Sequence, residues 1–209
     1  MMKDKVVIGK KITRKDILVS CLLIVFWCCL IASVCFTGVF SYLHLSFGIC
    51  VIIVVFLCIM LLLLLIPFVG SDISIEFSEN QVSYFHAKGY REKMNVILRV
   101  LKGHKEIPTM TLDTNDIAQL YITYTSIVMM YAQKGYQLQM VFLMKDESSF
   151  SIVPISYGQF ESGDYERALD LLERVGVNVV DRYGLRQVLN TSHEEFNKYV
   201  DAIEKRCRQ

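Results

Sequence analysis

Residues 17 to 71 form an uninterrupted stretch of 55 residues that contains no Asp, Glu, Lys or Arg. All 22 basic and 21 acidic residues of the 209-residue chain lie outside it. The core of a soluble domain does not require so long a run, whereas one helical crossing of a bilayer takes about 20 apolar residues. The stretch is therefore long enough for two crossings and a short turn.

We predict transmembrane helices at about residues 18–40 and 47–66, within a two-helix hairpin that covers residues 17–70. Backbone polar groups find no water inside a bilayer, so each apolar segment should satisfy its own groups as a helix. Pro67 and Gly70 follow the second segment and are expected to end it.

A row of small residues runs through the first apolar segment, because Ser33, Thr37 and Ser41 recur at four-residue intervals. Small residues let membrane helices approach closely, so we expect this row to pack against the second segment. Six of the seven Cys also lie in the two segments, and only Cys207 lies outside them. This distribution excludes a disulfide framework for the rest of the chain.

The residues before the first segment, 1–16, form a basic flank with six basic and two acidic side chains, while the turn at 41–46 has no charge. The positive-inside rule then places the N-terminus in the cytoplasm, and two crossings return the chain there. A secretory signal peptide is the first alternative, but no small-residue cleavage site follows the first segment and a second span does. A lipoprotein cleavage box at 18–21 is the second alternative, but no apolar segment precedes it.

Residues 71–209 are predicted to form one cytoplasmic α+β domain at the inner or plasma membrane. Alternating apolar residues predict a hairpin over 73–86 and an antiparallel meander over about 120–155. Two C-terminal helices should follow, one around residues 164–175 and one that starts at a capping box at 192–195. Segment 92–102 fits either a helix or a strand, and we expect a strand.

The strand opening at residues 73–82 follows the two apolar segments, and the pairs Ile107-Pro108 and Asp116-Ile117 come later. In this order of elements the chain resembles small membrane-anchored proteins of Gram-positive bacteria with a pleckstrin-homology-like (PH-like) domain. The resemblance implies a bent antiparallel sheet closed by one helix, and the two predicted C-terminal helices depart from it. Some proteins of this build resemble immunity partners of secreted or membrane-acting toxins, which is an analogy of architecture.

Residues 71–209 contain no motif of a nucleotide-binding loop, a hydrolase nucleophile elbow or a Cys-x-x-Cys pair. The sequence His193-Glu194-Glu195 lacks the second His of a zinc-binding helix. Residues 113–116 lack the Gly and the downstream Glu of a calcium loop. We therefore predict no catalytic residues, no metal ligands and no cofactor.

The segment 88–105 has a local charge of +5, although residues 71–209 hold 16 basic and 19 acidic side chains. Near an anionic leaflet each Lys or Arg contributes about 1 kcal/mol of attraction. The segment is therefore a candidate site for lipid or for an acidic protein partner, and a solvated face is the alternative. Its basic residues are Lys88, Arg91, Lys93, Arg99, Lys102 and Lys105.

These features predict a non-enzymatic, membrane-anchored binding protein. Our specific prediction is an immunity protein that protects the producing cell from a cognate toxin at the membrane. The expected partners are membrane lipid and a protein, either the toxin or a membrane complex, and no nucleic acid is expected. The alternatives are a regulatory or assembly subunit with a docking domain, and a membrane-bound hydrolase with a site built from scattered residues.

Overall fold

The chain divides into two compact units. The sheet unit comprises residues 1–11, 73–86 and 108–209, and the helical unit comprises residues 12–72 and 87–107. Segment 88–105 therefore belongs to the same unit as the two apolar segments. The computed structural model describes residues 5–35, 38, 46–69, 73–128, 134–154, 164–189 and 191–207.

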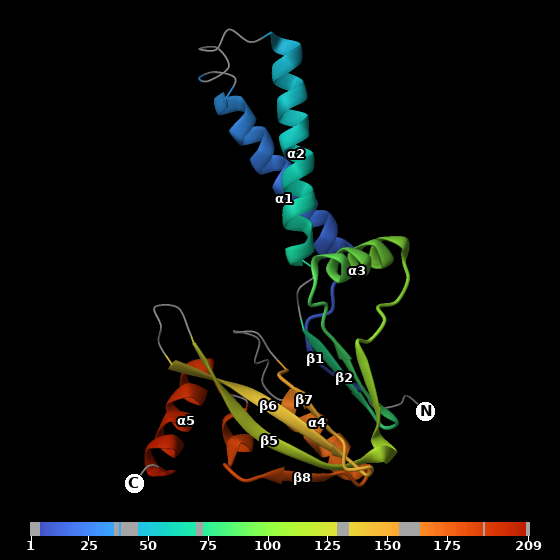
Figure 1. Cartoon of the computed structure of the whole chain (residues 1–209), viewed down its shortest axis with the longest axis vertical. Helices are drawn as coiled ribbons and strands as arrows, with labels where there is room; N and C mark the ends of the chain where they lie inside the picture. Colours follow the sequence, from blue (N-terminus) through green and yellow to red (C-terminus); the bar gives the residue numbers. More distant parts are fainter. Residues whose placement is uncertain are drawn as a thin grey trace. The chain divides into compact units, whose positions relative to one another are not determined.

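The helical unit contains two helices, α1 (Arg14–Cys35) and α2 (Phe47–Val69), that are long and apolar enough to span a membrane. They contact one another (Figure 1). The start of α1 is fixed by a reciprocal cap: the Asp16 carboxylate accepts from the Thr13 N–H at 3.0 Å, and the Thr13 hydroxyl accepts from the Asp16 N–H at 3.2 Å. Pro67 and Gly70 were expected to end the second helix; for Pro67 this is wrong, because α2 continues through it to Val69, and Gly70 lies outside the described residues.

The predicted strand at 92–102 is also wrong, because these residues belong to helix α3 (Tyr90–Lys102). The Glu92 carboxylate caps the first turn by accepting from the N–H groups of Lys88 and Gly89, at 2.9 and 3.4 Å. Gly103 ends the helix with a left-handed φ of 83°. A cap at each end favours a helix where the apolar spacing alone fits both structures.

The sheet unit begins with an antiparallel sheet of β1 (Lys5–Gly9), β2 (Ser74–Ser78), β3 (Gln81–Phe85) and β4 (Met110–Asp113). The hairpin predicted over 73–86 is β2 and β3. Strand β1 precedes α1 in the chain and pairs with β2, which follows α2. Residues 5–9, expected within a basic flank, are therefore part of the sheet, and residues 71–209 alone lack one of its strands.

The pairing of β1 with β2 includes an ionic contact. Lys5 and Lys11 both form ion pairs with the Glu76 carboxylate. Burial raises the pKa of that carboxyl, but the hydrogen bonds and charges of the two lysines outweigh burial, and the pKa lies below its ordinary value. The resulting stabilisation is present above the ordinary pKa of Glu and is lost as the pH falls through the lowered pKa.

A second sheet has the strand order β7-β6-β5-β8. Strands β5 (Ile117–Val128), β6 (Lys134–Met144) and β7 (Ser149–Ile152) form the predicted antiparallel meander. Strand β8 (Asn178–Asp181) pairs with β5 in parallel, a strand and a pairing absent from the predicted meander.

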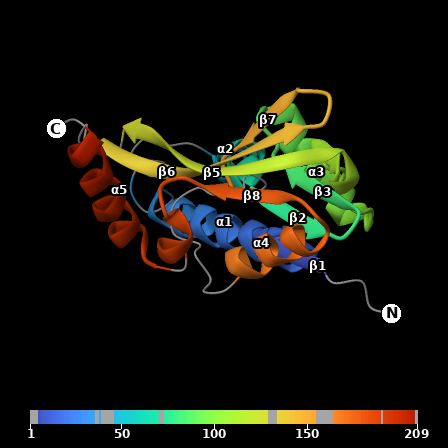
Figure 2. The same ribbon diagram turned by 90° about the horizontal axis from the view of Figure 1, so that it is seen from below.

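The two predicted C-terminal helices are α4 (Asp164–Arg174) and α5 (His193–Cys207). Helix α4 packs on β1, β2 and β8, and α5 packs on β6 (Figure 2). One hydrophobic core joins both sheets to both helices, so the sheet unit is a single α+β domain. Among its fully buried residues are Phe77, Phe142, Leu169 and Phe196.

Replacing Gly9 by Ala should weaken the β1–β2 pairing. Gly9 has a φ of 88°, and a Cβ there would overlap the carbonyl oxygen of Ile73. Gly176 is the matched control, because its φ is 91° and no atom lies within 4 Å of the position of a Cβ. The positive φ costs an Ala roughly 1–2 kcal/mol at either site. Any additional loss of stability at Gly9 therefore measures the overlap of the added Cβ with the Ile73 carbonyl oxygen.

The measurement is hydrogen exchange of the β2 amides in the full-length protein. We expect Gly9→Ala to accelerate this exchange clearly more than Gly176→Ala, which carries only the cost of the positive φ. Equal β2 exchange in the two variants would contradict the tight pairing of β1 against β2.

Candidate functional site

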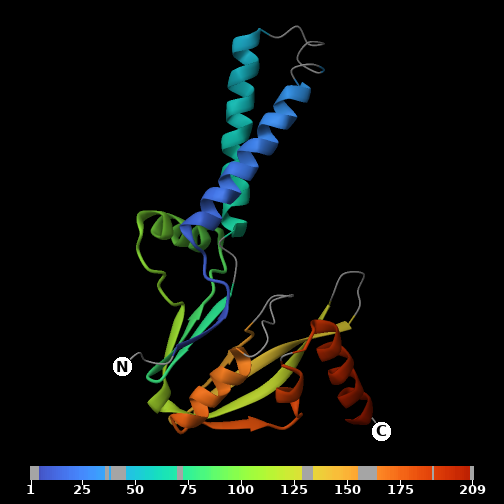
Figure 3. The ribbon, with the colours of Figure 1, turned by 180° about the vertical axis from the view of Figure 1, so that it is seen from behind.

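The candidate site is the surface around α3. Figures 1 and 3 view the helical unit from opposite sides, and both show α3 lying crosswise at the ends of α1 and α2 where these helices adjoin the flanking strands in sequence. Ile97 and Val100 of α3 are buried together with Ile17 of α1, and Ile66 and Val69 of α2 pack against this cluster. Helix α3 is thus fixed to both apolar helices by hydrophobic contact.

A hydrogen bond between Tyr90 and α2 satisfies a backbone group that Pro67 leaves unpaired. In a helix the Leu63 carbonyl would accept from the N–H of residue 67, but proline has none. The Tyr90 hydroxyl donates to this carbonyl at 2.9 Å. The contact explains how α2 continues through a proline, since a neighbouring donor replaces the missing one.

A second polar contact joins α3 to α1. The Arg14 guanidinium donates through Nε to the Val100 carbonyl at 3.0 Å. This carbonyl lies in the last turn of α3, where the helix dipole places partial negative charge and a cation is favourable. Arg14 and Tyr90 therefore hold opposite ends of α3 to different apolar helices.

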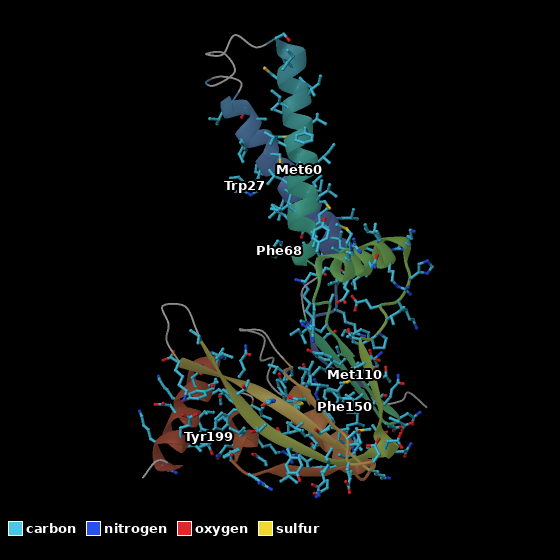
Figure 4. The ribbon with its side chains drawn as sticks, in the orientation of Figure 1. Trp27, Met60, Phe68, Met110, Phe150 and Tyr199 are labelled. Carbon is cyan, nitrogen blue, oxygen red and sulfur yellow. The ribbon has the colours of Figure 1, made fainter. Side chains whose placement is uncertain are left out.

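The structure brings the six predicted basic residues together around α3. Arg91, Lys93, Arg99 and Lys102 lie on the helix, with Lys88 before it and Lys105 after it. Lys93 and Arg99 are half-buried and the other four are exposed. The Lys93 ammonium lies 5.8 Å from the centre of the Phe68 ring, which is labelled in Figure 4 near the end of α2.

The basic residues of the two units differ in their partners. Seven basic residues of the sheet unit pair with carboxylates in that unit: Lys5, Lys11, Lys134, Arg167, Arg186, Lys198 and Lys205. Within the described part of the chain, none of the eight basic residues of the helical unit has a carboxylate partner. By sequence the helical unit has eight basic and four acidic residues, a net +4, and the sheet unit has 14 and 17.

The row of small residues predicted to pack the helical pair is described only at Ser33. Its side chain is exposed and donates to the Leu30 carbonyl of the same helix at 2.8 Å. Thr37 and Ser41 lie outside the described residues. Buried small residues of α1 and α2 are instead Cys28 and Cys50.

A cavity of 340 Å³ in the sheet unit is the strongest alternative site. It lies between β1 and the start of α4, and Lys11, Asp164 and Tyr165 line it. Lys11 is ion-paired with Glu76, and Asp164 with Arg167. Because these side chains are engaged in contacts within the fold, the cavity offers no evident pair of nucleophile and base.

Among the described residues, no group of three or more His, Cys, Asp or Glu is placed to hold a metal ion. Comparisons with protein-family models, with curated proteins and with solved structures found no match. The function is therefore argued from this chain's own residues.

The basic residues are evident in the sequence, whereas the contacts that position them are not. Tyr90 had an indirect signal, because a proline inside an apolar helix implies a carbonyl that needs another donor. Arg14 had none beyond its charge. A strand at 92–102 was expected, so the exposure of Leu98 and Leu101 on one face of a helix was not predicted.

Tyr90→Phe should weaken the attachment of α3 by about 0.5–1.5 kcal/mol, the usual net contribution of one hydrogen bond, because the Leu63 carbonyl then loses its donor. In a Pro67→Ala background residue 67 regains its N–H, so the same substitution should cost much less. The readout is hydrogen exchange of the α3 amides in the full chain in lipid nanodiscs. A cost of Tyr90→Phe that is equal in both backgrounds would show that its hydroxyl does not substitute for the missing donor.

Proposed function

We propose that the protein is a non-enzymatic binding protein anchored in the cell membrane by α1 and α2. The observation that carries the proposal is the pairing of β1 with β2. Strands that pair must lie in the same compartment, so the chain between them crosses the membrane an even number of times. The two apolar helices supply that number as a hairpin.

Positive charge supports the orientation of this hairpin. Arg14 and Lys15 begin α1, and α3 with its basic residues lies at the same end of the two helices. The positive-inside rule favours this end on the cytoplasmic side. Both termini and the sheet unit would then be cytoplasmic.

Within this class we propose an immunity role, in which the sheet unit holds a cognate toxin, or masks its target, at the membrane. The support is the resemblance in element order to membrane-anchored proteins with a PH-like domain, some of which resemble immunity partners. A regulatory or assembly subunit of a membrane complex is the second candidate. A docking domain at the membrane is equally compatible with the immunity role and with the regulatory or assembly role.

Topology can be tested without a functional assay. An alkaline phosphatase fusion after Gln209 should be inactive, because the enzyme folds only outside the cytoplasm, and a fusion within the turn at 41–46 should be active. Protease added to intact spheroplasts should leave the sheet unit uncleaved. An active fusion at Gln209 would overturn the orientation.

The immunity role predicts that a toxin gene lies beside the gene of this protein, and that full-length protein expressed in a strain sensitive to that toxin restores growth in its presence. A non-enzymatic mechanism predicts further that no single Asp, Glu or His substitution in the sheet unit abolishes protection while the protein stays folded, because binding energy is shared among several contacts. One such substitution that abolishes protection would favour the hydrolase, and absence of protection by the wild type would favour the regulatory role.

A further inference from the structure

We propose that α3 lies in the membrane–water interface and binds the headgroups of acidic phospholipids. The proposal rests on the membrane anchoring proposed above and names the partner of the α3 surface. Helix α3 combines three features of an interfacial helix: an exposed apolar strip, cations along the border of that strip, and attachment to α1 and α2.

The apolar strip consists of Met94, Leu98 and Leu101. These residues recur at i, i+4 and i+7, so they share one face of the helix. The strip adjoins the face that packs on α1 and α2, where Ile97 and Val100 are 1% and 8% exposed. Leu98 and Leu101 are 47% and 40% exposed, which leaves them available to an apolar phase outside the protein.

The cations border this strip on its outer side. Arg91 and Lys102 follow Leu98 around the helix, and both are exposed. The Nε of Arg99 is buried and has no hydrogen-bond partner among the described residues. An apolar face edged by Arg and Lys is the arrangement of a helix that lies in a membrane interface and attracts anionic lipid.

The attachment of α3 selects a bilayer rather than an acidic protein as the occupant. A bilayer that surrounds α1 and α2 ends near the level at which α3 packs across them, so the exposed strip meets the boundary between acyl chains and headgroups. Tyr90, 54% exposed, is a residue type enriched at that depth. Phosphate groups in the same layer supply the negative charge that the described residues do not provide for Arg91, Arg99 and Lys102.

The experiment uses the full-length protein in nanodiscs made of phosphatidylglycerol and phosphatidylcholine. Trp27, the only tryptophan, is replaced by Phe, and Leu98→Trp places a single fluorophore on the strip. One of the two lipids at a time carries brominated acyl chains, which quench tryptophan at short range. We expect quenching by both, and stronger quenching when the acidic lipid is brominated.

Arg91→Gln with Lys102→Gln tests the cations. Each charge removed should lower the preference for acidic lipid by up to about fivefold, and 1 M salt should also reduce the preference because the screening length falls to about 3 Å. Lys198→Gln with Lys205→Gln, two exposed lysines of α5, is the matched control and should leave the preference unchanged.

Trp27 in the otherwise unaltered protein separates the two proposals. Its quenching by brominated lipid tests the membrane anchoring. If Trp27 is quenched and the Trp at position 98 is not, the anchoring stands and the lipid proposal fails. Equal quenching by the two lipids also overturns the lipid proposal. So does a preference for acidic lipid that is unchanged by Arg91→Gln with Lys102→Gln. Release of the α3 surface from lipid by an acidic protein partner would overturn it as well.

Discussion

The pairing of β1 with β2 is the constraint on which the rest of the architecture depends. Its five residue pairs join the segments on either side of the two apolar helices. Only Lys10 to Thr13 lie between β1 and α1, and only four residues lie between Val69 and Ser74. The two apolar helices are therefore inserted in the chain between two paired strands, with four residues before α1 and four after α2.

Helix α3 leaves the same sheet in a similar way. Gly9 pairs with Ser74 and Ser74 with Phe85, while Met110 pairs with Tyr84. The ends of β1 and β3 and the starts of β2 and β4 are thus aligned across the sheet, and the chain passes from this edge into the helical unit and back twice. Four chain segments therefore connect the sheet to α1, α2 and α3, and within the helical unit the Arg14 and Tyr90 contacts hold α3 to α1 and α2.

The sequence predicted the elements whose signals are local. The charge-free stretch indicated α1 and α2, alternation indicated β2 and β3, and the capping box at 192–195 indicated α5. Strands β1, β4 and β8 were missed because short strands are defined by distant partners, and β8 pairs with β5 across more than 50 residues of chain. Only the composition of the candidate site was predicted, namely its six basic residues. Their arrangement on a helix was not, because the expected strand took no account of the caps that Glu92 and Gly103 form at the two ends of α3.

The position of β1 in the chain also determines when, during synthesis, the first sheet can form. Its residues leave the ribosome before α1, yet their partners in β2 follow the last residue of α2. The first sheet can close only after both apolar helices have been made, so under the proposed anchoring membrane insertion would begin before the core of the sheet unit is complete. Until β2 has been made, Val6 and Ile8 lack the strand with which they pair in the finished sheet, and the charges of the neighbouring Lys5, Lys10 and Lys11 favour the solubility of this segment.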